Sequence, residues 1–280
     1  MKNKMAVLMT ALTVFVVCVT GCGNTQTAAE PVPAPAEETE SAPESPEPAQ
    51  TEETETEADT RLLVVSFGTS YNDSRDITIG AIETDIAEAF PQYEVKRAFT
   101  AQIIIDKLKE RDGLEIDNVT EALDRAVADG VKKLIVQPTH LMNGLEYGDL
   151  AAELDTYKED FEQIVLGGPL LTSDADYEAV IRAITDATKS YDDGETAIVF
   201  MGHGTEAESN QVYATMQEKL GAAGFEHYYI GTVEAEPTLE DVAAALKEAG
   251  IYKKVVLQPL MVVAGDHANN DMAGDEEDSW

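Results

Sequence analysis

The sequence predicts an α/β fold of two similar lobes, each a parallel sheet flanked by helices, with a cleft between the lobes. Two observations predict this fold. From residue 61 onward, short apolar runs alternate with segments of helical periodicity, and this alternation is typical of right-handed βαβ units. Two stretches of the chain also repeat each other, which indicates a duplicated half. We expect an N-terminal lobe over residues 61–190 and a C-terminal lobe over residues 191–280.

Seven apolar runs are the predicted strands. They are short, contain many β-branched residues and are bounded by turn-forming or polar residues, as buried parallel strands usually are. The runs cover residues 62–67, 93–97, 133–137, 163–166, 197–201, 227–231 and 254–258.

The segments between these runs are the predicted helices. Their apolar residues recur every three to four positions, which is the spacing of an amphipathic helix. Parallel strands need crossover connections, so we expect these helices on both faces of the sheets. They cover residues 73–90, 103–111, 119–128, 148–161, 175–189, 207–222 and 239–248.

The first repeat is a strand that runs into a glycine turn. The string LLVVSFGTS in the first half matches AIVFMGHGT in the second. Aligning Gly68 with Gly202 places Thr69 opposite His203. Only the second copy would then carry an imidazole in its turn.

The second repeat joins VKKLIVQPTHLMNGLEYGD to YKKVVLQPLMVVAGDHANND. Aligning Pro138 with Pro259 places Glu146 opposite His267. Both repeats run in the same order, so the two lobes are expected to share one topology. Ligands of such folds bind beyond the carboxyl ends of the strands.

Polar side chains follow several of these strand ends. They are Thr69, His140 and Glu146 in the first lobe, and His203, Glu234 and His267 in the second. Two neutral imidazoles and one carboxylate suit a first-row divalent ion, and three protein ligands leave coordination positions open. The second-lobe set is therefore a candidate site for handling a metal ion.

Each candidate also has a purely structural interpretation. Between two glycines, His203 would only shape a turn, and His140 would be a core histidine with satisfied hydrogen bonds. Glu234, close to Glu236, would be a solvated loop charge. Met201, at the end of its strand, would be a wall residue rather than a ligand.

The N-terminus predicts export. Lys2 and Lys4 precede a short apolar stretch, and small residues precede Cys22, as in a lipoprotein signal peptide over residues 1–21. We expect Cys22 to carry lipid and to anchor the protein outside the cytoplasm on a bacterial membrane. An ordinary signal peptide with an incidental cysteine is the alternative. Cys18 lies within the signal, so no disulfide is expected in the mature protein.

Residues 22–60 predict a disordered acidic tether. This segment consists mainly of Glu, Pro, Ala, Thr and Ser and has no Lys, Arg or aromatic residue, so it cannot bury enough apolar surface to fold. The whole chain has a formal net charge of −35. A charge of this sign argues against nucleic acid as a partner, because phosphate binding needs a basic surface.

Several common catalytic motifs are missing from the sequence. It contains no P-loop, no Gly-x-Gly-x-x-Gly after the first predicted strand and no Gly-x-Ser-x-Gly elbow. These absences argue against a dinucleotide cofactor, a nucleotide phosphate site and an α/β-hydrolase mechanism. No organic cofactor is expected.

Longer strings resemble a known family. LLVVSFGTSYNDS, RAFTAQIIIDKLKERDG, MGHG and PLMVVAGDHANNDMAGDEEDSW closely resemble the anaerobic cobaltochelatases of the CbiK type, which are class II chelatases related in fold to ferrochelatase. The resemblance covers residues 61–280. It implies ATP-independent insertion of Co²⁺ into sirohydrochlorin in corrin biosynthesis, with Fe²⁺ or Ni²⁺ as alternative metals.

The resemblance also implies roles for individual residues. The metal-binding residues would be His203, Glu234 and His267, and the catalytic residues would be His203, as proton acceptor, and Glu146. Candidates for the substrate cleft are Ser66, Thr69, His140 and Met201. The expected partners are a tetrapyrrole, a divalent metal and, through the lipid anchor, a membrane; a homo-oligomer is a further expectation.

Two features depart from the family pattern. Family members continue beyond the Asp-Ser-Trp with which this sequence ends, so we expect the second lobe to lack a final helix. Sirohydrochlorin is made in the cytoplasm, whereas the N-terminus predicts export. The alternative function is therefore an exported lipoprotein that binds haem, another tetrapyrrole or metal in the same cleft.

Overall fold

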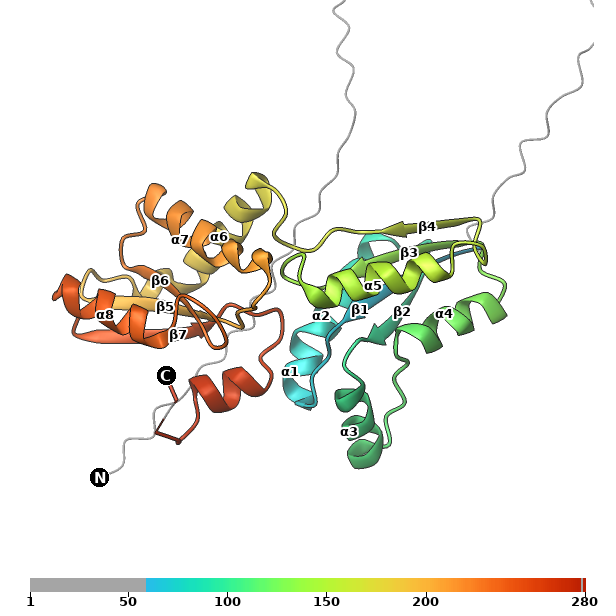
Figure 1. Ribbon diagram of the computed structural model, residues 1–280, viewed down its shortest axis with the longest axis horizontal. Helices are drawn as coiled ribbons and strands as arrows, with labels where there is room; N and C mark the ends of the chain where they lie inside the picture. The colour runs from blue at the N-terminus through green and yellow to red at the C-terminus, as the bar shows by residue number, and fades with distance from the viewer. Residues whose placement is uncertain (1–58, 278) are drawn as a thin grey trace, which may run out of the picture. The chain divides into compact units, whose positions relative to one another are not determined.

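Two parallel sheets organise residues 59–277 and 279–280, which the computed structural model describes (Figure 1). The strand order is β2-β1-β3-β4 in the first sheet and β6-β5-β7 in the second. The strands are β1 Thr60–Ser66, β2 Glu94–Phe99, β3 Lys133–Pro138, β4 Gln163–Leu166, β5 Thr196–Gly202, β6 Tyr228–Thr232 and β7 Lys254–Pro259. Every one lies on a predicted apolar run, which confirms the α/β fold with parallel sheets.

Helices connect the strands and cover the sheets. They are α1 Asn72–Ile77, α2 Ile79–Ala89, α3 Gln102–Asp112, α4 Val119–Ala128, α5 Leu145–Thr156, α6 Asp174–Thr188, α7 Gln211–Ala222 and α8 Leu239–Ala249. Short helical segments are η2 Lys189–Tyr191, η3 Glu208–Asn210 and the π-type η4 Ala268–Met272. Asn118, Ser173 and Thr238 begin α4, α6 and α8 with capping boxes, which satisfy the free backbone N–H groups of a first turn.

Three predicted helices differ from the structure. The helix predicted over 207–222 begins only at Gln211, after the short segment η3. The helix predicted over 73–90 is divided at Thr78, where φ is −113° and ψ is −80°, outside the helical region. The Thr78 hydroxyl donates a hydrogen bond to the carbonyl of Ser74. The helix predicted over 148–161 instead begins at Leu145 and ends at Thr156, because Gly144 rather than Gly148 precedes the first turn.

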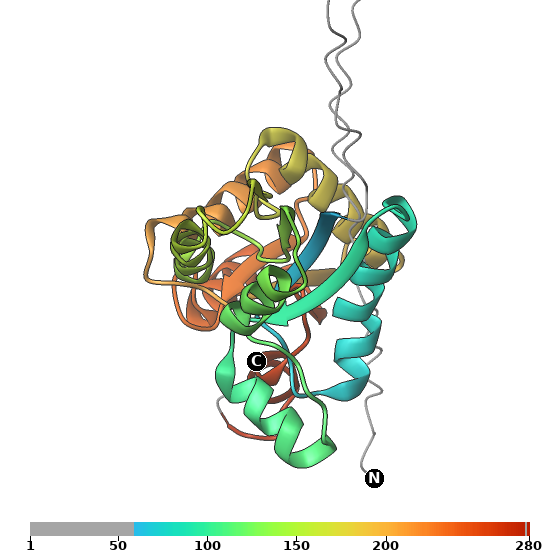
Figure 2. The same cartoon turned by 90° about the vertical axis from the view of Figure 1, so that its right-hand side faces the viewer.

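Alternating side chains of each central strand reach helices on opposite faces. In β1, Leu62 and Val64 pack with Ile86 of α2, whereas Leu63 and Val65 pack with α4 and α5. Figure 2 shows α2 and α5 on opposite sides of this sheet. Strand β5 follows the same plan, with α8 on one face and α6 and α7 on the other. The prediction assigned α6 to residues 61–190, but its Val180, Ile181 and Ile184 join the core of the second sheet.

The two lobes share the same chain path, but the glycine alignment predicted from sequence is shifted. The amide of Ala101 donates to the carbonyl of Phe67 at 3.2 Å, and the amide of Glu234 donates to that of His203 at 2.9 Å. These matching bonds make Phe67, not Thr69, the counterpart of His203. The predicted pairing of Thr69 with His203 is therefore wrong by two residues.

Backbone conformation supports the corrected alignment. It pairs Gly68 with Gly204, and these glycines have φ of 101° and 87°, values that residues with a Cβ rarely adopt. Gly202, which the sequence alignment had paired with Gly68, lies at the end of β5. Both halves therefore turn at a left-handed glycine, one residue beyond Phe67 or His203.

The second predicted alignment is confirmed. The amide of Gly144 donates to the carbonyl of Met142, and the amide of Gly265 donates to that of Val263, at 2.9 and 3.0 Å. Glu146 and His267 follow these glycines at the same distance along the chain. They are therefore structural counterparts.

The lobes meet at the carboxyl ends of both sheets. Met142 of the first lobe packs against the hydrophobic core of the second. Val263, its counterpart, packs against a core cluster of the first lobe. The Tyr71 hydroxyl also donates to Asp266 Oδ1 across the boundary, at 3.2 Å. The described residues all belong to one compact unit, and these contacts join loops beyond the strand ends of the two lobes.

The predicted signal peptide, Cys22 and most of the predicted tether lie outside the described residues. Thr60, the last residue assigned to the tether, is the first residue of β1. In residues 59–277 and 279–280, no helix has the length and apolar character needed to cross a bilayer.

Candidate metal centre

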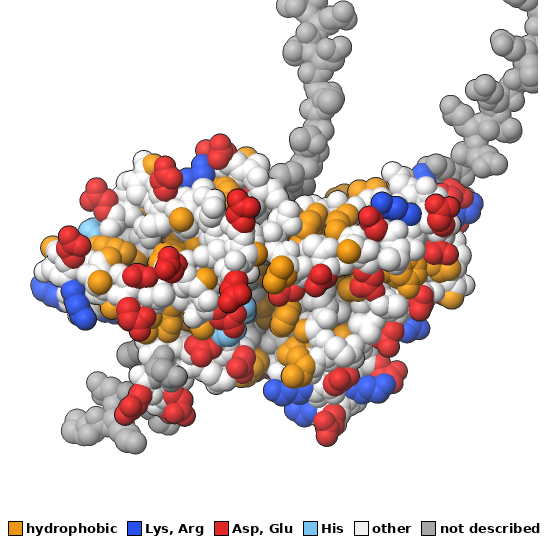
Figure 3. Space-filling view, viewed as in Figure 1, with side chains coloured by type: hydrophobic (Ala, Val, Ile, Leu, Met, Phe, Trp, Pro, Cys, Tyr) orange, Lys and Arg blue, Asp and Glu red, His pale blue; other side chains and the backbone are white. Residues whose placement is uncertain are grey.

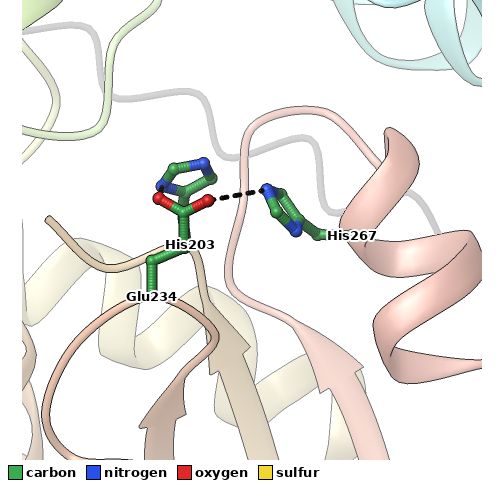
Figure 4. Close-up of side chains that lie close together, drawn as sticks. All are labelled: His203, Glu234 and His267. Carbon is green, nitrogen blue, oxygen red and sulfur yellow. Dashed lines mark ion pairs between the residues drawn. The ribbon is translucent and has the colours of Figure 1, made fainter. Parts of the chain in front are cut away.

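Three side chains of the second lobe converge beyond its strand ends. His203 follows β5, Glu234 follows β6 and His267 follows β7. One ligand atom from each lies within 4.8 Å of the others, and Figure 4 shows the Glu234 carboxylate beside both imidazoles. At metal–ligand distances of about 2.1 Å, tetrahedral ligand atoms lie roughly 3.4 Å apart. Side-chain rotations would thus bring all three onto one ion.

The Gly-His-Gly turn holds His203 outward. A Cβ added at Gly202 would lie 2.2 Å from the ring of Tyr213, so only glycine lets this buried ring pack beneath the strand end. Gly204 has φ of 87°, and a Cβ there would lie 2.8 Å from the backbone nitrogen of Ala235. The Tyr213 hydroxyl accepts a hydrogen bond from the Gly204 amide. The turn is therefore fixed on both sides of the imidazole.

Hydrogen bonds also hold the loop that carries Glu234. Its amide donates to the carbonyl of His203, which links the two ligand-bearing segments directly. The Thr232 hydroxyl donates to the carbonyl of Ala235 at 2.5 Å, and the Asn210 side chain donates to that of Glu236 at 2.7 Å. The side chain of Glu234 is 53% exposed, so its carboxylate remains accessible to a hydrated cation.

His267 is oriented by Asp271, a residue that the sequence analysis did not identify. His267 Nδ1 lies 2.7 Å from Asp271 Oδ2, one helical turn further along. Ala268 and Met272 anchor this segment in the core beside Met201. A carboxylate on the far nitrogen of a metal-binding histidine fixes the orientation of the ring. The spacing of four residues on a helix is the sequence signal that could have found Asp271.

These hydrogen bonds assign the tautomers of both imidazoles. His203 Nδ1 lies 2.7 Å from the carbonyl oxygen of Gly204, which only accepts, so Nδ1 carries the proton. Nε2 of His203 then keeps its lone pair. Because Nδ1 is the nitrogen that lies 3.8 Å from Glu234 Oε2, metal binding through Nε2 requires rotation of the His203 ring. Asp271 likewise keeps the proton of His267 on Nδ1, and Nε2 of that ring lies 3.8 Å from Glu234 Oε1. Each imidazole therefore offers one free nitrogen to a metal ion or a proton.

The first-lobe candidates Glu146 and His140 lie on the other side of the lobe boundary. Glu146 is exposed in the first turn of α5. Both ring nitrogens of His140 are buried without a hydrogen-bond partner, unlike the satisfied core histidine considered above. Burial lowers the pKa of His140, and the nearby Glu146 carboxylate partly opposes this shift.

Three further candidates have buried side chains. Ser66 is 1% exposed and its hydroxyl accepts from that of Thr139. Thr69 is 2% exposed and its hydroxyl accepts from the amide of Tyr71. Met201 is fully buried in the core beneath η4. The structure therefore places these three candidate side chains in the protein interior.

Comparisons with known proteins find a matching family model and similar proteins. A family model described as Cobalt chelatase (CbiK) matches residues 60–280. A sirohydrochlorin cobaltochelatase of Salmonella typhimurium is 40% identical over 219 residues, which are 78% of this chain and 82% of that protein. Sirohydrochlorin cobaltochelatase CbiKC of Nitratidesulfovibrio vulgaris is 31% identical over 221 residues, 78% of this chain and 77% of that protein.

Proposed function

The chain belongs to the CbiK family of cobalt chelatases, and on this premise we propose that it is a sirohydrochlorin cobaltochelatase. It inserts Co²⁺ into sirohydrochlorin without ATP, a step of cobalamin biosynthesis. The observation that carries this proposal is the convergence of His203, Glu234 and His267 beyond the strand ends of the second lobe. Two imidazoles and one carboxylate bind a divalent ion less tightly than thiolates would, so the ion can be transferred to the macrocycle.

The reaction exchanges one cation for two protons. Co²⁺ forms bonds to the macrocycle nitrogens as two pyrrole N–H protons leave, so charge is conserved. We assign the first proton to His203, whose Nε2 is free to accept it once the metal moves to the macrocycle. An imidazole is suited to this exchange because its ordinary pKa lies near neutral pH.

Glu146 is the proposed second proton acceptor. It is the counterpart of His267, and it lies on the lobe that faces the metal ligands. A macrocycle held between the lobes would have the metal ligands on one side and this carboxylate on the other. The exposed Glu146 side chain is able to pass its proton to solvent.

The alternative of a haem-binding or scavenging lipoprotein is not favoured. Both relatives above are named for cobalt insertion into sirohydrochlorin. The alternative would use the same ligands but would need no proton acceptor.

Turnover tests the proposal directly. The purified protein, mixed with sirohydrochlorin and Co²⁺ without ATP, should give the absorbance spectrum of the cobalt complex faster than the uncatalysed control. Parallel reactions with Fe²⁺ and Ni²⁺ test whether these metals are also inserted, and a haem titration tests the alternative. Tight haem binding without insertion of any of the three metals would contradict the proposal.

We also propose that the protein is a lipoprotein anchored outside the cytoplasm through Cys22. The basic N-terminus, the apolar stretch and the small residues before Cys22 support it. The full chain should fractionate with membranes, and Cys22→Ser should be released or left unprocessed. Recovery of soluble wild-type protein that keeps residues 1–21 would contradict the anchor.

A further inference from the structure

Three exposed hydrophobic side chains lie beyond the carboxyl ends of the first sheet. Phe67 follows β1, Ile103 follows β2 and Leu145 follows β3. They are 49%, 76% and 67% exposed. Since β1 lies between β2 and β3, Phe67 follows the middle strand of the three. We call these three residues the apolar row.

The counterparts of the apolar row in the second lobe are charged or metal-binding. The matching backbone bonds pair Phe67 with His203. Counting along the chain from the matched residues pairs Ile103 with Glu236 and Leu145 with Asp266. The matched residues beyond the strand ends are therefore polar in the second lobe and apolar in the first. Ala101, the counterpart of Glu234, also lacks a donor atom, so the first lobe has no equivalent set of metal ligands.

Contacts between the lobes bring loops that follow these two sets of strand ends close to each other. Tyr71, four residues after Phe67, donates to Asp266, which precedes His267. A Cβ added at Gly265 would lie 3.8 Å from Thr69 Oγ1. Figure 3 shows hydrophobic side chains gathered along the lobe junction, close to a histidine. An exposed group of large apolar side chains beside a polar site usually marks a binding surface.

We propose that the apolar row is the platform for one face of the tetrapyrrole macrocycle. This inference rests on the proposed function. A conjugated macrocycle is flat and apolar on both faces and carries its carboxylates at the periphery. The protein has a net charge of −35, so long-range electrostatics oppose the approach of such an anion. Contact between the ring face and apolar side chains supplies the missing affinity.

The platform determines from which face of the macrocycle the metal ion enters. With one face of the macrocycle on Phe67, only the opposite face meets His203, Glu234 and His267. Co²⁺ then enters from the second lobe, and Phe67 offers no atom that could hold the metal on the other side. Phe67 acts as a specificity-determining residue for a flat, apolar-faced substrate.

Substitution of Phe67 tests the platform. Sirohydrochlorin is titrated without metal into wild type and Phe67→Ala, and binding is followed by the change in macrocycle absorbance. Loss of the aromatic contact should weaken sirohydrochlorin binding roughly 10- to 100-fold, whereas Co²⁺ binding, measured by calorimetry without tetrapyrrole, should stay unchanged. Phe67→Trp, which keeps a flat aromatic surface, should bind within a few-fold of wild type.

A matched control removes an equally exposed side chain elsewhere. Val255 is 46% exposed near the start of β7, away from the carboxyl ends, and Val255→Ala should bind sirohydrochlorin like wild type. Sedimentation of the same samples reports self-association.

The outcomes distinguish failure of the platform proposal from failure of the proposed function. Wild-type affinity in Phe67→Ala, with cobalt insertion intact in the wild type, overturns the platform alone. A wild type that self-associates through Phe67 also overturns it and assigns the surface to a second copy of the chain. A wild type that neither binds sirohydrochlorin nor inserts cobalt overturns the proposed function together with the platform.

Discussion

Phe67 in the first lobe occupies the position that His203 occupies in the second. Each residue lies just before a glycine with positive φ, and each carbonyl accepts a hydrogen bond from the segment that follows the neighbouring strand. The same backbone turn thus presents an aromatic surface in one lobe and an imidazole in the other. Duplication preserved the scaffold, while the chemistry diverged at the side chain that the turn presents.

Replacing His203 should abolish cobalt insertion and leave tetrapyrrole binding nearly unchanged. Removing a general base usually lowers a rate by about 10² to 10⁴, and losing a metal ligand adds to that loss. The measurement is the insertion rate of His203→Ala beside its affinity for sirohydrochlorin. His227→Ala is the control, because His227 lies by Tyr252 and not among the proposed ligands. Insertion by His203→Ala at the wild-type rate would exclude His203 as the base.

Asp271→Asn should weaken Co²⁺ binding without unfolding the protein. The change keeps the shape of the side chain that orients His267 but removes its charge, and losses of such partners lower metal affinity by about 10- to 100-fold. Calorimetric titration with Co²⁺ measures the effect. Asp275→Asn removes the same charge from an exposed neighbour and should bind Co²⁺ like wild type. Equal losses in both variants would point to general electrostatics instead.

Gly204→Ala should be more damaging than Gly194→Ala. Both glycines have positive φ, 87° and 80°, but only the Cβ at position 204 meets other atoms within 4 Å. Gly194→Ala should lose about 1–2 kcal/mol of unfolding free energy through backbone strain alone. Gly204→Ala should lose more, and it should also lose Co²⁺ affinity because Ala235, next to Glu234, must shift. Urea unfolding and Co²⁺ titration of both variants check this; equal stability losses would contradict the steric argument.

His140 should make the fold sensitive to mild acid. Its pKa is lowered in the folded protein, so below pH about 6.5, the ordinary histidine pKa, the unfolded chain binds more protons than the folded one. This contribution to stability is complete above that pH and is lost as the pH falls toward the folded pKa. His140→Leu should therefore narrow the difference in unfolding free energy between pH 7.5 and pH 5.

Urea unfolding of wild type and His140→Leu at both pH values provides the test. At pH 7.5 the variant should be at least as stable as wild type, since it removes two buried nitrogens without partners. An unchanged pH difference would show that His140 is not responsible for it.

The strands were the elements of the fold that the sequence predicted best. Buried parallel strands such as β1 and β5 consist of continuous apolar residues, so their position follows directly from hydrophobicity. The break at Thr78 was not predictable in this way, because it depends on a threonine hydroxyl that bonds back to Ser74. A helical pattern of apolar residues continues through such a break.

The candidate site could be predicted from the sequence only in part. Strand ends and family resemblance led to His203, Glu234 and His267, whereas the sequence alone did not show that the side chains of Ser66 and Met201 are buried. The alignment error at the first repeat has a simple cause. Both residues that flank His203 are glycines, Gly202 and Gly204, and only the positive φ of Gly204 shows which one matches Gly68.

The exchange of Met142 and Val263 between the lobes has a mechanical consequence. Each side chain completes the core of the opposite lobe, so pulling the lobes apart exposes apolar surface at two places simultaneously. The two halves should therefore melt in a single cooperative transition, although each has its own sheet. A bulky ring must then be admitted and released by movement of the loops beyond the strand ends, with the two cores still locked together.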